Sequence, residues 1–206
     1  MPLSDLPDEQ QAAFRARLAQ AGIDPADVVA YVGPDTHPGQ LRASAEPGQS
    51  TITAHLMEVA TVDELKVMTG IPDEHYTSGR MQEHHRIPEP WPSDRMLTSA
   101  RDATPQQRNE IHHAQLVWLY GNSARVESYR DVINATDYPK TLPVFAAEEL
   151  VITAENSPYV ITGDSGHIYG LVTIYAGGSI AFEGNVDFDC QRMVKSDEPG
   201  PARGGA

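Results

Sequence analysis

The spacing of the apolar residues changes at Pro143, and this change limits the folds that the 206-residue chain can adopt. Before Pro143, apolar side chains such as Ile111, Ala114 and Trp118 recur about every 3.6 residues, which is typical of an amphipathic helix. After Pro143 they alternate about every second residue, as in a strand. Helices first and strands last predict an α+β fold, in which N-terminal helices pack on a small C-terminal β module.

Turn residues divide the β module, residues 144–195, into short strands. Gly163 and Gly177 each lie in such a turn, and the strands recur about every 8–12 residues. This spacing is typical of a sandwich, a barrel or a short β-solenoid, and the three alternatives remain open. The stretch from His167 to Tyr175 is apolar on both faces, so we expect it to be covered on both sides.

Capping and turn signals organise the remainder of the chain. Gly22 should end a first helix, and Asp24 with Pro25 should begin a second. Thr61 with Glu64, and Thr104 with Gln107, predict the starts of two further helices. The expected segments are a helical hairpin over 1–33, a Pro-, Gly- and Ser-rich linker over 34–50, a mainly helical region with a Pro-rich loop over 51–143, and a disordered tail over 196–206.

Histidine and glutamate pairs indicate one candidate metal site. Glu110 and His113 are three residues apart on an expected helix, so their side chains can face one point. His84 or His85, from the Pro-rich loop, could supply a further ligand. Imidazole and carboxylate suit zinc or another divalent metal, so a metal-dependent enzyme is the alternative function. The competing interpretation is a surface or packed histidine pair, with no cofactor.

Alternating oxygen side chains indicate a second candidate site. Asn185, Asp187 and Asp189 fall on one face of an expected strand, and oxygen ligands suit Ca²⁺. A solvated outer face explains the same pattern without a cation. Ser165 and His167 are close in sequence, but a Gly-x-Ser-x-Gly elbow is missing, so we interpret the segment as a turn and expect no catalytic residues.

Charge restricts the partners. The chain has 15 Lys and Arg against 29 Asp and Glu, a net charge of −14, which disfavours nucleic acids and anionic lipids. Residues 141–191 contain no Lys or Arg and seven Asp or Glu, so a basic protein is a possible partner. No apolar stretch is long enough for a transmembrane segment, and no secretory signal precedes residue 20. We therefore expect a protein that is cytoplasmic or released without a signal peptide.

Tyrosines of the β module indicate an interaction surface. We expect Tyr159, Tyr169, Leu171 and Tyr175 to form an interface between copies, because tyrosine offers a large contact area with a polar tip. The sequence thus favours a non-enzymatic interaction or self-assembly protein that forms a homo-oligomer. Lectin-like binding of carbohydrate, an immunity-like acidic partner of a basic protein, and a toxin component all fit this description equally.

Overall fold

The chain forms two compact units. A computed structural model describes residues 3–46, 48–184 and 186–201. Unit 1 comprises Met1–Met57 and Leu142–Ala206, and unit 2 comprises Glu58–Thr141. Within the described ranges there are five α-helices and eight strands, so the chain is of mixed α/β class. The units are not successive along the chain, in contrast to the linear division that the sequence predicts.

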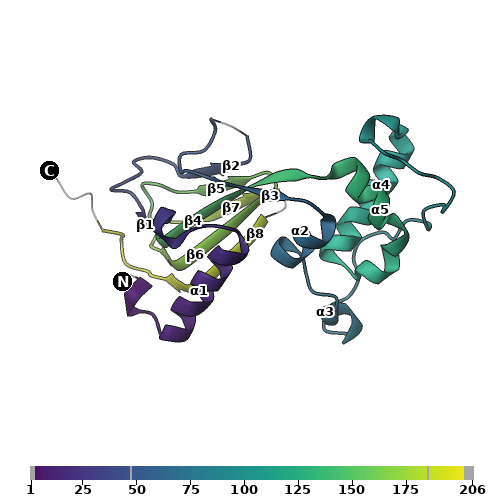
Figure 1. Ribbon diagram of the computed structural model, residues 1–206. Helices are drawn as coiled ribbons and strands as arrows, with labels where there is room; N and C mark the ends of the chain where they lie inside the picture. Colours follow the sequence, from purple (N-terminus) through teal and green to yellow (C-terminus); the bar gives the residue numbers. More distant parts are fainter. Residues whose placement is uncertain (1–2, 47, 185, 202–206) are drawn as a thin grey trace. The chain divides into compact units, whose positions relative to one another are not determined.

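The strands of unit 1 wind into a short parallel β-solenoid (Figure 1). One sheet has the order β1-β4-β6-β8 and the other the order β2-β5-β7, and every ladder between neighbours in these two orders is parallel. The strands are β1 (Val29–Val32), β2 (Arg42–Ser44), β4 (Lys140–Ile152), β5 (Tyr159–Thr162), β6 (Ser165–Ile174), β7 (Ile180–Glu183) and β8 (Val186–Lys195). A further strand, β3 (His55–Val59), pairs with β4 outside these orders.

Each coil of the solenoid takes 21 or 22 residues. Val144 of β4 pairs with Gly166 of β6, and Ser165 of β6 pairs with Val186 of β8. The first coil is different, because Val29 pairs with Ala147 and Arg42 with Val160, an offset of 118 residues in both sheets. Unit 2 is therefore an insertion between the first and second coils that leaves the two sheets in the same register.

Apolar side chains fill the space between the two sheets. The inner residues are buried and come from both sheets and from the loops on either side of β2: Val32, Leu41, Ala43, Ile52, Phe145, Ala147, Leu150, Ile152, Tyr159, Ile161, Tyr169 and Val172. Tyr169 and Val172 of β6 both point into the core although they are three residues apart, so the alternation of inward and outward side chains shifts by one residue between them. Gly170 lies at this shift, and a Cβ atom there would meet the carbonyl oxygen of Glu148. Alternation by two residues therefore holds only on each side of this irregularity.

Helix α1 (Asp8–Gln20) contacts β6 and β8 in unit 1 (Figure 1). Its buried residues, Phe14 and Leu18, are four positions apart and share one helix face. Gly22 has φ of +67° directly after the helix, which confirms the left-handed end that the sequence predicts.

The segment after Gly22 differs from the predicted second helix and linker. Asp24 caps only a 3-10 turn, Pro25–Asp27, and the chain then enters β1 and, after a loop, β2. Pairing of β1 with β4 outweighs the local helix signal, because Val29 and Val32 fit the edge of a parallel sheet. The linker of the prediction thus contains a strand of the second sheet.

Unit 2 contains short helices connected by loops. The helices are α2 (Val62–Thr69), α3 (Glu74–Thr77), α4 (Pro105–Tyr120) and α5 (Arg130–Asp137), with the 3-10 segment η4 (Ser123–Tyr129) before α5. Thr61 caps α2 through the backbone N–H of Glu64, and Thr104 with Gln107 forms a complete capping box on α4. Both helix starts are confirmed, and α4 buries Ile111, Ala114 and Trp118 as its spacing predicts.

The described part of the expected tail is bonded to the solenoid. The backbone N–H of Ser196 donates to the carbonyl of Ile174, and that of Ala176 donates to the carbonyl of Glu198. The remainder of the predicted tail, 202–206, lies outside the described residues.

Candidate functional site

A polar network lies inside the solenoid. Ser165 Oγ is hydrogen-bonded to His167 Nε2 at 3.0 Å, and His167 Nδ1 lies 3.1 Å from the hydroxyl of Tyr159. The hydroxyls of Tyr159 and Tyr169 are 2.7 Å apart. All four residues are buried, so each polar group is satisfied by another member of the network and not by solvent.

Burial keeps the ionisable groups of this network uncharged. It lowers the pKa of His167 to about 3, so the imidazole is neutral near neutral pH. Burial also raises the pKa of Tyr159, and Tyr169 adds to that effect. The imidazole is stacked between the rings of Phe145 and Phe188, at centroid distances of 5.1 and 5.9 Å. Such a closed, neutral arrangement fixes the register of adjacent coils.

The structure corrects the predicted tyrosine interface. Tyr159, Tyr169 and Leu171 are buried within the chain itself, and only Tyr175 is partly exposed. The sequence shows correctly that both faces of β6 avoid water, but the cover comes from the second sheet and from α1. The missing information is the parallel return of the chain, which period-two alternation does not reveal.

The acidic pair of β8 meets a cation supplied by α1. The Arg17 guanidinium lies 2.5 Å from an Asp187 oxygen and 3.2 Å from an Asp189 oxygen. Burial raises the pKa of Asp187, although Arg17 acts in the opposite direction. The two aspartates share the outer face of β8, as their spacing predicts, and Asn185 lies outside the described residues. Their positive partner in this structure is an arginine of the same chain.

The predicted metal ligands do not come together. Glu110 accepts a hydrogen bond from Gln106 on the same helix, and the ring of His113 lies 6.1 Å from that of His112. Among the described residues, no group of three or more His, Cys, Asp or Glu side chains could hold a metal ion. His84 is exposed, and the ring of His85 is 6.4 Å from that of Tyr120. Spacing along one helix could not show where the Pro-rich loop places its histidines.

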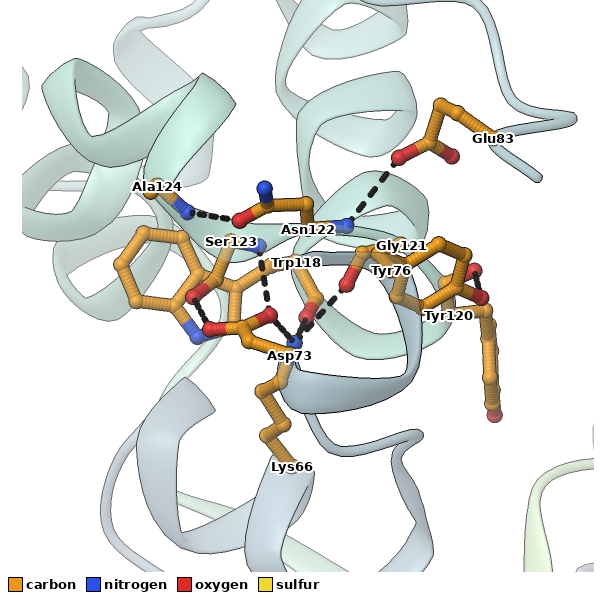
Figure 2. Close-up of polar contacts among 10 residues, drawn as sticks. All are labelled: Lys66, Asp73, Tyr76, Glu83, Trp118, Tyr120, Gly121, Asn122, Ser123 and Ala124. Atoms are coloured by element: carbon orange, nitrogen blue, oxygen red, sulfur yellow. Dashed lines mark hydrogen bonds and ion pairs between the residues drawn. The ribbon is translucent and has the colours of Figure 1, made fainter. Parts of the chain in front are cut away.

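A polar cluster in unit 2 closes the C-terminal end of α4 (Figure 2). The Lys66 ammonium donates to the carbonyls of Trp118 and Gly121 and lies 2.7 Å from Asp73 Oδ1. Asp73 also accepts from the Ser123 backbone N–H at 2.9 Å and hydroxyl at 2.6 Å. Burial raises the pKa of Asp73, but the hydrogen bonds from Lys66 and Ser123 outweigh it and lower the pKa overall.

This cluster has a structural role. The three donors of the Lys66 ammonium all have acceptors, and both carboxylate oxygens of Asp73 have donors. A positive charge at a helix C-terminus also stabilises the helix dipole. Sequence reasoning missed this cluster because its members are dispersed from residue 66 to residue 123.

A groove of about 420 Å³ also lies in unit 2. Trp91 and Met96 are among the residues that line it, and Glu127 and Asp131 contribute acidic groups. The Trp91 indole donates to the Arg95 carbonyl at 2.8 Å, and the Arg95 guanidinium lies 6.0 Å from its ring. Trp91 is buried by these contacts, so it forms part of the wall and is not a free ring for a ligand.

The last coil of the solenoid presents apolar side chains to solvent. We call the end of the solenoid formed by the edges of β7 and β8, which are unpaired among the described residues, the open end. The side chains there that point toward the interior of the solenoid are Ile180, Phe182, Phe188, Cys190 and Met193. Phe182 and Met193 are about half exposed, at 54% and 51%, whereas the residues beside them in the preceding coils, Ile161 and Val172, are fully buried. In the described part of the chain, β7 and β8 are the terminal strands of their sheets.

Comparison with protein-family models, curated proteins and solved structures found no match to this chain. None of the helices in the described ranges combines the length and the apolar character that a membrane span requires.

Proposed function

We propose that this chain is a non-enzymatic interaction protein that self-associates through the open end of its solenoid. The observation that supports the proposal is that, among the described residues, both sheets terminate there in strands that pair on one side only and carry half-exposed inner side chains. Exposed strand edges with apolar flanks pair readily with another chain. In this proposal α1 covers the outer face of β6 and β8 and leaves the edge of β8 accessible.

The buried network supports a scaffold in preference to a catalyst. Ser165 and His167 have the spacing of a nucleophile and its base, but they are enclosed between the two sheets and hydrogen-bonded to each other. A reacting group must reach its substrate, so the network is better suited to holding the coils in register. A rigid solenoid then presents its last coil in a defined shape.

The mass of the protein in solution tests the proposal. We expect the native chain to exceed its monomer mass of 22.5 kDa by light scattering at tens of micromolar. The double substitution Phe182→Lys with Met193→Lys should reduce the mass to that of the monomer, because association would bury two ammonium groups from each copy.

A matched control uses exposed apolar residues of unit 2. Val67 and Met96 are exposed to 75% and 85%, so Val67→Lys with Met96→Lys adds the same charge to unit 2 and leaves the residues of the open end unchanged. This control should retain the native mass. A monomeric native chain, or equal loss of mass in both double variants, contradicts the proposal.

A further inference from the structure

The two faces of β8 follow from its pairing with β6. Phe188 pairs with His167 and Met193 with Val172, and both β6 residues point into the solenoid. Asp189 pairs with Ile168, and Arg192 pairs with Leu171. Ile168 and Leu171 lie on the outer face of β6, so Asp189 and Arg192 lie on the outer face of β8. The strand therefore carries an acid and a base on its outer face, separated by the phase change near Cys190.

We infer that the partner at the open end is a second copy of this chain, whose β8 pairs antiparallel with the first over its full length. The inference rests on the proposed function and specifies its geometry. A twofold axis that joins two identical strand edges into one sheet requires them to be antiparallel and keeps both outer faces on the same side. Full overlap places Val186 of one copy opposite Lys195 of the other.

This register brings complementary side chains of the two β8 strands opposite each other. It places Asp189 opposite Arg192 on the outer face and Phe188 opposite Met193 on the inner face, each pair occurring twice. Acidic residues occupy the first half of β8 and basic residues the second, so antiparallel copies have complementary charges along the edge. The ten residues of β8 also offer the backbone groups of their free edge to the partner strand.

The charges at the centre of the proposed pair can be exchanged. Asp189→Arg alone would place two arginines opposite each other, and Arg192→Asp alone would place two aspartates opposite each other. We expect each variant to be monomeric when alone and to form a dimer when the two are mixed in equal amounts, because both cross-strand pairs are then restored. Asp189→Arg also removes the 3.2 Å contact of Asp189 with Arg17 within the same chain, whereas Arg17 retains Asp187 as a partner in both variants.

Light scattering of each variant and of the mixture provides the measurement, with circular dichroism to show that each variant is folded. If the native chain is a dimer and the single substitutions leave its mass unchanged, the proposed register is wrong. The register is also wrong if mixing the two variants does not restore the dimer mass. In both cases association at the open end still stands. A native monomer overturns the proposed function as well. Mass that grows continuously with concentration indicates head-to-tail addition to β1 and overturns the twofold pair.

Val194 gives a second test that leaves Asp189 and Arg192 in place. In the proposed register it lies opposite Asp187 on the outer face. Val194→Lys should tighten the dimer and Val194→Asp should weaken it, each by about two- to fivefold in Kd. Equal effects of the two substitutions, or the reverse order, contradict the register.

Discussion

The neutral imidazole of His167 connects three coils of the solenoid at the scale of a single residue. It lies between the rings of Phe145 from the preceding strand and Phe188 from the following one, and its nitrogens bind Ser165 and Tyr159. Protonation would place an unpaired charge in the interior. The fold therefore depends on this group remaining uncharged.

His167 should make the solenoid less stable in mild acid. Its folded pKa of about 3 lies below the unfolded value of about 6.5, so the unfolded chain binds the proton first as the pH falls. Stability is fully present above about pH 6.5 and decreases by about 1.4 kcal/mol per pH unit below it, or about 2 kcal/mol at pH 5.

The measurement is the free energy of unfolding of unit 1 at pH 7 and pH 5, from hydrogen exchange of the β6 amides. His167→Phe is the control, because it preserves the stack of rings and removes the titration. The native chain should lose about 2 kcal/mol more than the variant between the two pH values. Equal losses in both proteins would show that the imidazole is not held neutral.

At the scale of elements, α4 depends on a lysine from α2. Lys66 reaches the last carbonyls of α4 and is mostly buried there, with 12% of its side chain exposed. The same ammonium pairs with Asp73, which in turn binds the start of η4 through Ser123. One side chain thus connects three segments of unit 2.

Lys66→Met should destabilise unit 2 by about 2–4 kcal/mol, because it leaves the Asp73 carboxylate and two carbonyls without their shared donor. Both tryptophans of the chain, Trp91 and Trp118, lie in unit 2, so tryptophan fluorescence during urea unfolding reports on this unit. Lys195→Met, in β8, should leave that transition unchanged. An unaltered transition for Lys66→Met would mean that water replaces the lysine at little cost.

At the scale of the whole molecule, unit 2 interrupts the solenoid without changing its register. Both sheets continue across the insertion with the same offset, as Val29 with Ala147 and Arg42 with Val160 show. A chain that joins residue 57 to residue 142 through a short Gly-Ser linker should therefore keep the fold of unit 1. Its circular dichroism spectrum should show strands together with the helix α1, and it should melt cooperatively. A non-cooperative or unfolded product would show that unit 1 requires unit 2.

The sequence predicts local features of this chain better than its long-range pairing. The capping residues Thr61 and Thr104 identify two helix starts, because a cap is decided by neighbouring residues. The β module is also recognisable from alternation. Neither β1 nor the source of the cover over Tyr169 could be predicted, because both depend on strands that return in parallel from elsewhere in the chain, and the 21- or 22-residue spacing relates only β4, β6 and β8 in one sheet and β5 and β7 in the other.

The long offset of the first coil also determines the order in which the chain can fold during synthesis. When β1 and β2 leave the ribosome, the strands that complete their sheets are more than one hundred residues from being made. All of unit 2 emerges in the interval, and its contacts are closer in sequence, so it can fold first. Until β4 and β5 have been translated, β1 and β2 lack their sheet partners, and the later coils of the solenoid can add only after that.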